Sequence, residues 1–189
     1  YDTVRTPFGA VTEVLGGSAA YFSVAAAFFT DVRLVAVVGE DFAEEHLQLL
    51  RERRVDLEGL SRVPGRTFRW RGEYGFDLNE AKTLETHLNV FATFRPRIPP
   101  AYRESEVVFL ANIDPDLQRE VLAQVAAPRL VAADTMNFWI MGKPEALRET
   151  LKQVHTLLIN DAEARMLTGE PNLVKAARKI LSWGPRSLV

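Results

Sequence analysis

The sequence predicts the α/β fold class: a mostly parallel sheet covered by helices on both faces, with a smaller β insertion. Short apolar runs alternate with amphipathic stretches along the chain, which is the pattern of βαβ units. Residues 64–99 interrupt this rhythm and show no helical period. With 189 residues, 47% of them hydrophobic, the chain is long enough for one domain with a sizeable core, so we expect a single domain over residues 1–189.

The individual elements follow from this alternation. The apolar run at residues 33–38 predicts a buried strand, and Asp41 is placed to cap a helix that continues to about residue 54. Further along, the same signals predict strands at residues 107–110, 130–133 and 156–159, and helices at residues 115–126, 145–154, 161–168 and 173–183.

The interrupting section predicts a hairpin-like β insertion. In the segment TFRWRGEYGF the aromatic side chains fall on one side of an extended chain: Phe68, Trp70, Tyr74 and Phe76. A second alternating run at residues 83–91 could pair with this segment. Such an aromatic face covers the core of its own domain, a ligand or another subunit, and the pattern alone leaves these three choices open.

The stretch LGGSAAYFSVAAAFF at residues 15–29 predicts a helix without a polar face. A helix that is apolar all round is buried all round, so residues 18–29 should lie inside the domain, with Ser18 as the N-cap. Gly16 and Gly17 allow backbone torsions and close approaches that a Cβ atom forbids. They indicate either a ligand against the backbone at a helix N-terminus or a tight turn into a core helix.

Composition narrows the class of partner. A formal net charge of -2 gives no electrostatic reason to expect nucleic acid or an anionic membrane. The absence of cysteine excludes disulfides, thiolate nucleophiles and Cys-ligated zinc, and the three histidines show no ligand spacing. No apolar run reaches about 18 residues, and no signal peptide opens the chain. We therefore expect a cytoplasmic protein that binds a small molecule.

Four features carry a family resemblance. They are GGSAAYFSVAAAFF at residues 16–29, VAVVGEDF at residues 35–42, the aromatic β insertion, and NDAEARMLTG at residues 160–169. Their order and separation resemble the ribokinase-like (PfkB) family of carbohydrate and nucleoside kinases. The resemblance implies a Rossmann-like α/β/α sandwich with a small β-sheet lid, the cofactors ATP and Mg²⁺, a sugar or nucleoside substrate, and a possible homodimer through the lid.

The resemblance also implies substrate-binding residues near the N-terminus. Asp2 stands where the family places an acidic residue that holds substrate hydroxyls, and a carboxylate accepts such hydrogen bonds strongly. Gly16 and Gly17 correspond to the family's substrate-side diglycine. The family often has Asn four residues after the second glycine, whereas this chain has Tyr21, which leaves the identity of the substrate open.

Two further substrate contacts are expected after predicted strands. Asn112 in FLANIDP and Asp134 in ADTMNFW lie where α/β sheets place ligands, at the carboxyl ends of strands. Asp134 and Asn137 resemble the family's Asp-x-Asn segment with one extra residue between them. The alternative for these residues is an Asx turn that satisfies loop backbone groups.

Asn160 and Glu163 have two interpretations. In the family an Asn-x-x-Glu pair helps organise the metal, its waters and the nucleotide phosphates, which suits oxygen ligands of Mg²⁺. The same spacing is also close to a capping box that starts a helix. The position directly after the strand at residues 156–159 favours the family interpretation.

The resemblance leaves one part of the site unaccounted for. In the family a Gly-Ala-Gly-Asp segment supplies the catalytic base and stabilises phosphate charge, and no such segment occurs in this sequence. We expect the base beyond Val189, a chain that is incomplete at both ends, and no turnover by the chain alone. The alternative function is a non-catalytic α/β domain that binds or regulates through a small molecule.

Overall fold

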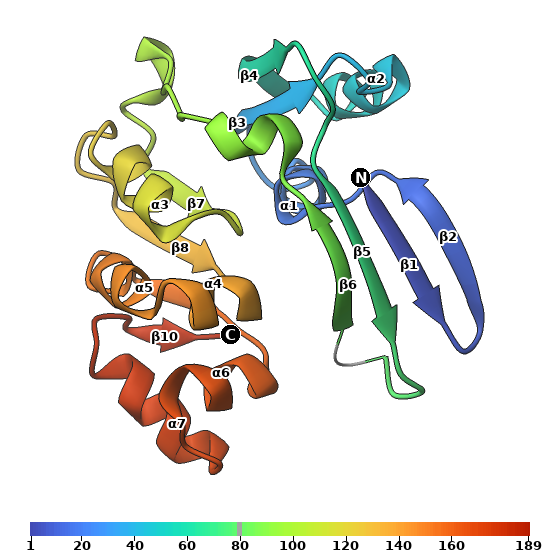
Figure 1. Cartoon of the computed structure of the whole chain (residues 1–189). Helices are drawn as coiled ribbons and strands as arrows, with labels where there is room; N and C mark the ends of the chain where they lie inside the picture. Colours follow the sequence, from blue (N-terminus) through green and yellow to red (C-terminus); the bar gives the residue numbers. More distant parts are fainter. Residues whose placement is uncertain (79–80) are drawn as a thin grey trace. The chain divides into compact units, whose positions relative to one another are not determined.

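The computed structural model describes residues 1–78 and 81–189. The chain divides into two compact units, unit 1 at Tyr1–Pro96 and unit 2 at Arg97–Val189. Unit 1 has a four-stranded and a two-stranded sheet, and unit 2 has one four-stranded sheet (Figure 1). Buried hydrophobic clusters form within each unit. The single domain expected over residues 1–189 stays a prediction.

Unit 1 contains a four-stranded sheet with the strand order β2-β1-β5-β6. Its strands are β1 (Asp2–Thr6), β2 (Gly9–Val14), β5 (Arg69–Tyr74) and β6 (Ala81–His87). The pairs β1/β2 and β5/β6 are antiparallel, and β1 and β5 join them by a parallel pairing (Figure 1). The predicted β insertion is therefore confirmed, although its second strand ends earlier than expected and is followed by the 3-10 helix η1 (Asn89–Thr93).

The remainder of unit 1 combines two parallel strands with two helices. Strands β3 (Val32–Gly39) and β4 (Val55–Val63) pair in parallel. Helix α1 (Ser18–Ala26) contacts β3, and helix α2 (Glu44–Glu52) contacts β4. Strand β3 confirms the apolar run predicted as a strand. Strand β4 was not predicted, because VDLEGLSRV alternates too irregularly to suggest a buried strand.

Helix α1 differs from its prediction in burial and in capping. Only Ser23 of its nine residues is buried, whereas Tyr21 is 68% exposed and Phe29, just beyond the helix, is 90% exposed. The small residues pack against the β3/β4 core, so one side of the helix is covered by its own unit. The predicted burial on all sides is therefore wrong, since an apolar sequence does not fix how many neighbouring layers a helix has. The N-cap is Gly17, and Ser18 is the first helical residue.

Asp41 does not cap helix α2, which begins at Glu44 with Ala43 as the N-cap. Its carboxylate instead accepts hydrogen bonds from the backbone N–H and the hydroxyl of Thr67, both at 2.7 Å, and pairs with Arg69 at 2.8 Å. Arg69 also pairs with Glu13 on β2 at 2.5 Å. This network connects the end of β3 to the four-stranded sheet.

Acid should weaken unit 1 through Asp41. Burial raises the pKa of this carboxyl, but the hydrogen bonds from Thr67 and Arg69 outweigh it and lower the pKa from 3.8 to about 2. A depressed carboxyl pKa stabilises the fold above the unfolded value and loses this contribution as the pH falls towards 2. Asp41→Asn should therefore remove about 1 to 2 kcal/mol of stability at pH 6 and far less at pH 2.5. Urea unfolding at both pH values measures the difference.

The control for this measurement is Asp31→Asn, which changes an exposed carboxylate just before β3. It should leave the stability at pH 6 almost unchanged. Equal losses for Asp41→Asn at pH 6 and pH 2.5 would contradict the role given to the ionised carboxylate.

Unit 2 contains a parallel four-stranded sheet with the order β10-β9-β8-β7. Its elements are η2 (Pro100–Tyr102), β7 (Val107–Leu110), α3 (Pro115–Leu122), β8 (Leu130–Asp134), α4 (Asn137–Gly142), α5 (Pro144–Leu151), β9 (Thr156–Leu158), α6 (Asp161–Thr168), α7 (Leu173–Leu181) and β10 (Ser187–Leu188). All predicted strands and helices of this unit are confirmed, to within a few residues at their ends. The short helix α4 was not predicted.

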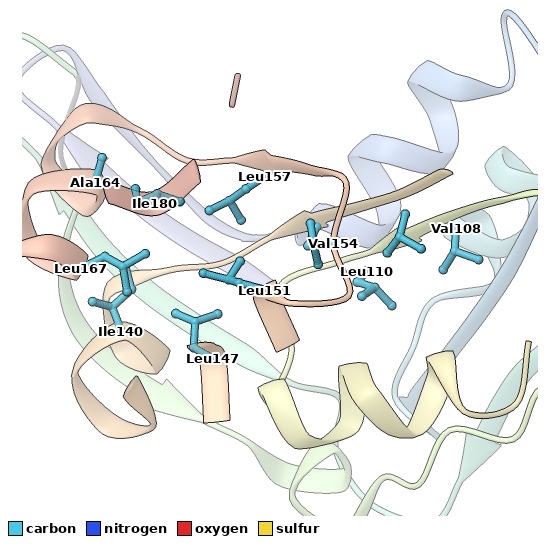
Figure 2. Packing of buried hydrophobic residues seen from close by; sticks show 12 residues of the cluster. Val108, Leu110, Ile140, Leu147, Leu151, Val154, Leu157, Ala164, Leu167 and Ile180 are labelled. Atoms are coloured by element: carbon cyan, nitrogen blue, oxygen red, sulfur yellow. The ribbon is translucent and has the colours of Figure 1, made fainter. Parts of the chain in front are cut away.

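The core of unit 2 lies between the sheet and its helices. Figure 2 shows Leu157 of β9 near Leu147 and Leu151 of α5, with Ile180 of α7 and Leu167 of α6 completing this part of the cluster. Leu151, Leu157 and Ile180 have no exposed surface. This packing fixes the strands whose carboxyl ends carry the predicted site residues. Among the described residues no helix is long and apolar enough to cross a membrane.

Candidate functional site

In unit 1 the structure brings Asp2 together with the glycine pair. A Cβ atom at Gly16 would overlap the Asp2 carboxylate and would lie 3.0 Å from the Asp2 Cβ atom, so this carboxylate packs on the bare Cα of Gly16. The backbone N–H of Gly17 donates a hydrogen bond to the same carboxylate. Gly17 has φ 88° and ψ 144° at the N-cap of α1, a conformation that favours glycine. Gly16 is therefore required for steric reasons, and Gly17 for its backbone conformation.

The Asp2 carboxylate is held in a desolvated position. Burial raises its pKa above the usual value, while the N-terminal amine and the hydrogen bond from Gly17 lower it only in part. A carboxylate that has lost hydration water gains more from a new hydrogen-bond donor than a solvated one does. Polar hydroxyl groups of a ligand are donors of this kind.

An aromatic side chain lies next to Asp2 on the same sheet. The register pairs Asp2 with Trp70 and Val4 with Gly72, and alternating residues of paired strands share one face. The Trp70 ring lies across Gly72, where a Cβ atom would overlap it, and its Nε1 donates to the Thr83 hydroxyl at 3.1 Å. The predicted aromatic face thus includes a fixed indole beside the Asp2 strand. A homodimer through this sheet stays a prediction.

Tyr21 lies on the first turn of α1, where its backbone N–H donates to the Gly17 carbonyl at 3.2 Å. Its side chain is largely exposed. The structure therefore places Tyr21 one turn beyond the diglycine, and its expected contact with a substrate stays a prediction.

In unit 2 the predicted residues gather after the ends of neighbouring strands. Asn112 follows β7, and Asp134 is the last residue of β8, which pairs with β7 on one side and β9 on the other. Asn160 and Glu163 follow β9 at the start of α6. Parallel strands present their carboxyl ends at one edge of the sheet, so these residues occupy the edge where such sheets bind ligands.

Asn160 and Glu163 form a capping box. The Asn160 side chain accepts from the Glu163 backbone N–H at 2.8 Å, and Glu163 Oε2 accepts from the Asn160 backbone N–H at 3.2 Å. The capping box, which the sequence offered as the alternative for this pair, is therefore present. A role in binding metal and phosphate stays a prediction beside it.

The electrostatics of Glu163 suit a cation nearby. Burial raises the pKa of this carboxyl, the hydrogen bond from Asn160 opposes the rise, and the negative charge of Asp134 adds to it. Two carboxylates that repel each other in a partly buried site gain stability when a cation binds between or beside them. Among residues 1–78 and 81–189, no group of three or more His, Cys, Asp or Glu side chains could hold a metal ion. A site with only the two carboxylates of Glu163 and Asp134 nevertheless fits Mg²⁺, which often takes one or two carboxylates and completes its shell with water and phosphate.

Two residues of this edge were not identified from the sequence. Gln118 of α3 is 1% exposed and donates to backbone carbonyls at the ends of β7 and β8. Thr135, directly after β8, has a buried hydroxyl without a hydrogen-bond partner in the described part of the chain. A glutamine on the apolar stripe of a predicted helix was the available signal for Gln118. Nothing in the pattern singles out Thr135.

Comparison with known proteins decides the family. The sequence profile of the pfkB family carbohydrate kinases matches residues 2–189. The chain belongs to the pfkB carbohydrate kinase family. Its fold class, an α/β sandwich of the ribokinase type with a small additional β-sheet, is therefore the predicted one.

One relative of this pfkB chain is identified by sequence similarity, and two are identified by structural similarity. A cytidine kinase of Thermococcus kodakarensis is 29% identical over 191 residues, covering 100% of this chain and 68% of the relative. The Methanocaldococcus jannaschii nucleoside kinase has a TM-score of 0.67 at 15% identity, with 99% of this chain and 65% of that one covered. A putative ribokinase II of E. coli has a TM-score of 0.74 at 13% identity, with 99% and 68% covered. The chain thus spans about two thirds of the length of these relatives.

Proposed function

We propose that this pfkB-family chain binds the hydroxyl-bearing substrate of an ATP-dependent kinase, a sugar or a nucleoside, and does not transfer phosphate by itself. The Asp2 carboxylate carries the proposal, because it is desolvated, packed on Gly16 and oriented by the Gly17 N–H. A group in this state can bind two adjacent hydroxyls of a polyol. The cytidine kinase relative favours a nucleoside within this range of substrates.

On the substrate side, Trp70 supplies a second kind of contact. Its indole is held flat on the sheet by Gly72 and Thr83, in register with Asp2. Sugars and nucleobases both present flat apolar faces that pack on aromatic rings. We infer that Asp2 orients the hydroxyls while Trp70 covers the ring that bears them.

On the phosphate side, Asn160 and Glu163 would hold Mg²⁺ through its water ligands, with the negative charge of Asp134 adding to the attraction. Bound Mg²⁺ would supply neutralisation of the phosphate charges of ATP. Asn112 and Asp134, at the ends of the neighbouring strands β7 and β8, are proposed as further contacts to the substrate. No Asp in this sequence follows a glycine-rich turn of the Gly-Ala-Gly-Asp type, so no residue is assigned as the catalytic base.

The proposal predicts binding without turnover. Isothermal titration of the 189-residue chain with cytidine, adenosine, ribose and fructose should give saturable binding for at least one of them. Asp2→Asn, which keeps the shape of the side chain and removes its charge, should weaken that binding by about 10- to 100-fold, because a hydrogen bond to a charged group contributes about 1.5 to 3 kcal/mol. A coupled assay of ADP release with ATP and Mg²⁺ should show no turnover.

The matched control is Asp31→Asn, which removes an equal charge at an exposed position in the same unit. Turnover above about one per second, which is within the ordinary kinase range, would refute the absence of a catalytic base. Failure of every compound to bind, or equal binding by Asp2→Asn and the unmodified chain, would refute the substrate role of Asp2.

A further inference from the structure

Gln118 is a buried polar side chain that connects the ends of two strands. It lies on α3, and its Nε2 donates to the carbonyls of Ala111 at 3.0 Å and Asp134 at 3.1 Å. A third carbonyl, that of Leu110, lies farther away at 3.4 Å. An amide nitrogen carries two hydrogens, so the two shorter contacts use its full donor capacity.

These hydrogen bonds extend the sheet beyond its own ladder. The pairing of β7 with β8 ends at Leu110 and Ala133. The next residues along the two strands are Ala111 and Asp134, and the Gln118 amide bonds to the carbonyls of both. Gln118 thus takes the place of the next rung between these two strands.

The residues fixed in this way are predicted ligand contacts. Asn112 directly follows Ala111, and Asp134 has its own carbonyl bonded to Gln118. Asp134 also acts electrostatically on Glu163. We propose that Gln118 is a positioning residue, which holds Asn112 and Asp134 in the geometry that binds ligand. The identity of the ligand in this inference rests on the proposed function, whereas the positioning of the two strand ends by Gln118 does not.

The chemistry of the side chain explains why a glutamine is needed. A partly buried carbonyl without a donor carries a desolvation cost, and the carbonyls of Ala111 and Asp134 come from two different strands. A single side chain with two N–H groups in one plane can satisfy both and thereby fixes their separation. A hydrophobic residue of equal size would fill the space and leave the strand ends free to move apart.

The test compares Gln118→Met with Thr150→Val in the full chain. Both replacements keep the approximate side-chain volume and remove a donor from a fully buried position in the same unit. The single hydrogen of the Thr150 hydroxyl can donate to the Pro115 carbonyl at 2.9 Å or to the Ala146 carbonyl at 3.1 Å, and the first of these contacts joins α5 to the start of α3 rather than to the strand ends. A general loss of packing or stability would affect both variants alike.

Two measurements separate positioning from stability. Backbone ¹⁵N relaxation should give order parameters at Asn112 and Asp134 that fall from about 0.85 to below about 0.6 in Gln118→Met and stay rigid in Thr150→Val. Titration with cytidine should show at least a tenfold weaker Kd for Gln118→Met alone. Unchanged order parameters, or equal weakening of binding by the two variants, overturns the proposal.

The relaxation and titration measurements also separate this inference from the proposed function. If the unmodified chain binds neither cytidine nor ribose, the proposed function fails, and the order parameters alone decide whether Gln118 positions the strand ends. If Gln118→Met does not fold, Gln118→Glu replaces it, because it keeps the side-chain shape. Its carboxyl can donate one hydrogen bond only when protonated, so order at Asn112 and Asp134 should then decrease as the pH rises. Order that does not change with pH in this variant overturns the proposal.

Discussion

Gly16→Ala is expected to weaken substrate binding by at least about 100-fold. The added Cβ atom would overlap the Asp2 carboxylate, which must then rotate away from Gly16 and from the Gly17 N–H. Two charge-assisted hydrogen bonds to substrate hydroxyls would be lost together, at about 1.5 to 3 kcal/mol each. Calorimetric titration with the ligand that binds the unmodified chain measures the loss.

Gly142→Ala is the matched control for this change. No atom lies within 4 Å of a Cβ atom built at Gly142, and the residue ends helix α4 without a positive φ angle. Its binding should equal that of the unmodified chain. An affinity within threefold of the unmodified chain for Gly16→Ala would show that the Asp2 carboxylate does not bind substrate in the orientation described.

Leu157→Ala is expected to have the largest effect on stability, a loss of about 2 to 5 kcal/mol from unit 2. Leu157 lies on β9 within the parallel sheet and has no exposed surface, so truncation leaves a cavity between the sheet and its helices (Figure 2). Chemical unfolding followed by tryptophan fluorescence in a Trp70→Phe background reports this unit, because the remaining Trp139 and Trp183 both belong to it.

Leu173→Ala serves as the control, since it removes the same atoms from a side chain that is exposed at the start of α7. It should change the stability by no more than about 0.5 kcal/mol. A loss below about 1 kcal/mol for Leu157→Ala would mean that the surrounding side chains collapse into the space, contrary to the close packing of this cluster.

The fold of unit 2 could be predicted from the sequence because its signals are local. Strand β7 has four consecutive apolar residues, and α6 has Asn160 as its N-cap and Gly169, in the left-handed conformation, as its C-cap. Unit 1 was harder. The hairpin of β1 and β2 consists of exposed and half-buried residues without a regular alternation, and β2 is exposed along its whole length. Periodicity reports burial, so it cannot find a strand that buries little.

Residues of the candidate site were identified from the sequence only where a family motif occurs, and their roles in binding stay predictions. Asp2, Gly16 and Gly17 come together as expected, yet the reason lies in a contact between a side chain and a bare Cα that no sequence period encodes. Gln118 was missed for a related reason. A polar residue on a helix usually faces solvent, and only the three-dimensional position of the β7 and β8 carbonyls reveals its use.

The parallel pairing of β1 with β5 has a consequence for the order of folding. Each antiparallel pair in this sheet joins neighbouring parts of the chain, whereas the contact between the Tyr1 amine and the Phe68 carbonyl, 2.8 Å long, spans 67 residues. Closing so large a loop costs conformational entropy before any long-range contact compensates for it. We expect Asp2 to reach its place beside Trp70 only after both pairs exist, so refolding should restore ligand recognition later than it restores β structure.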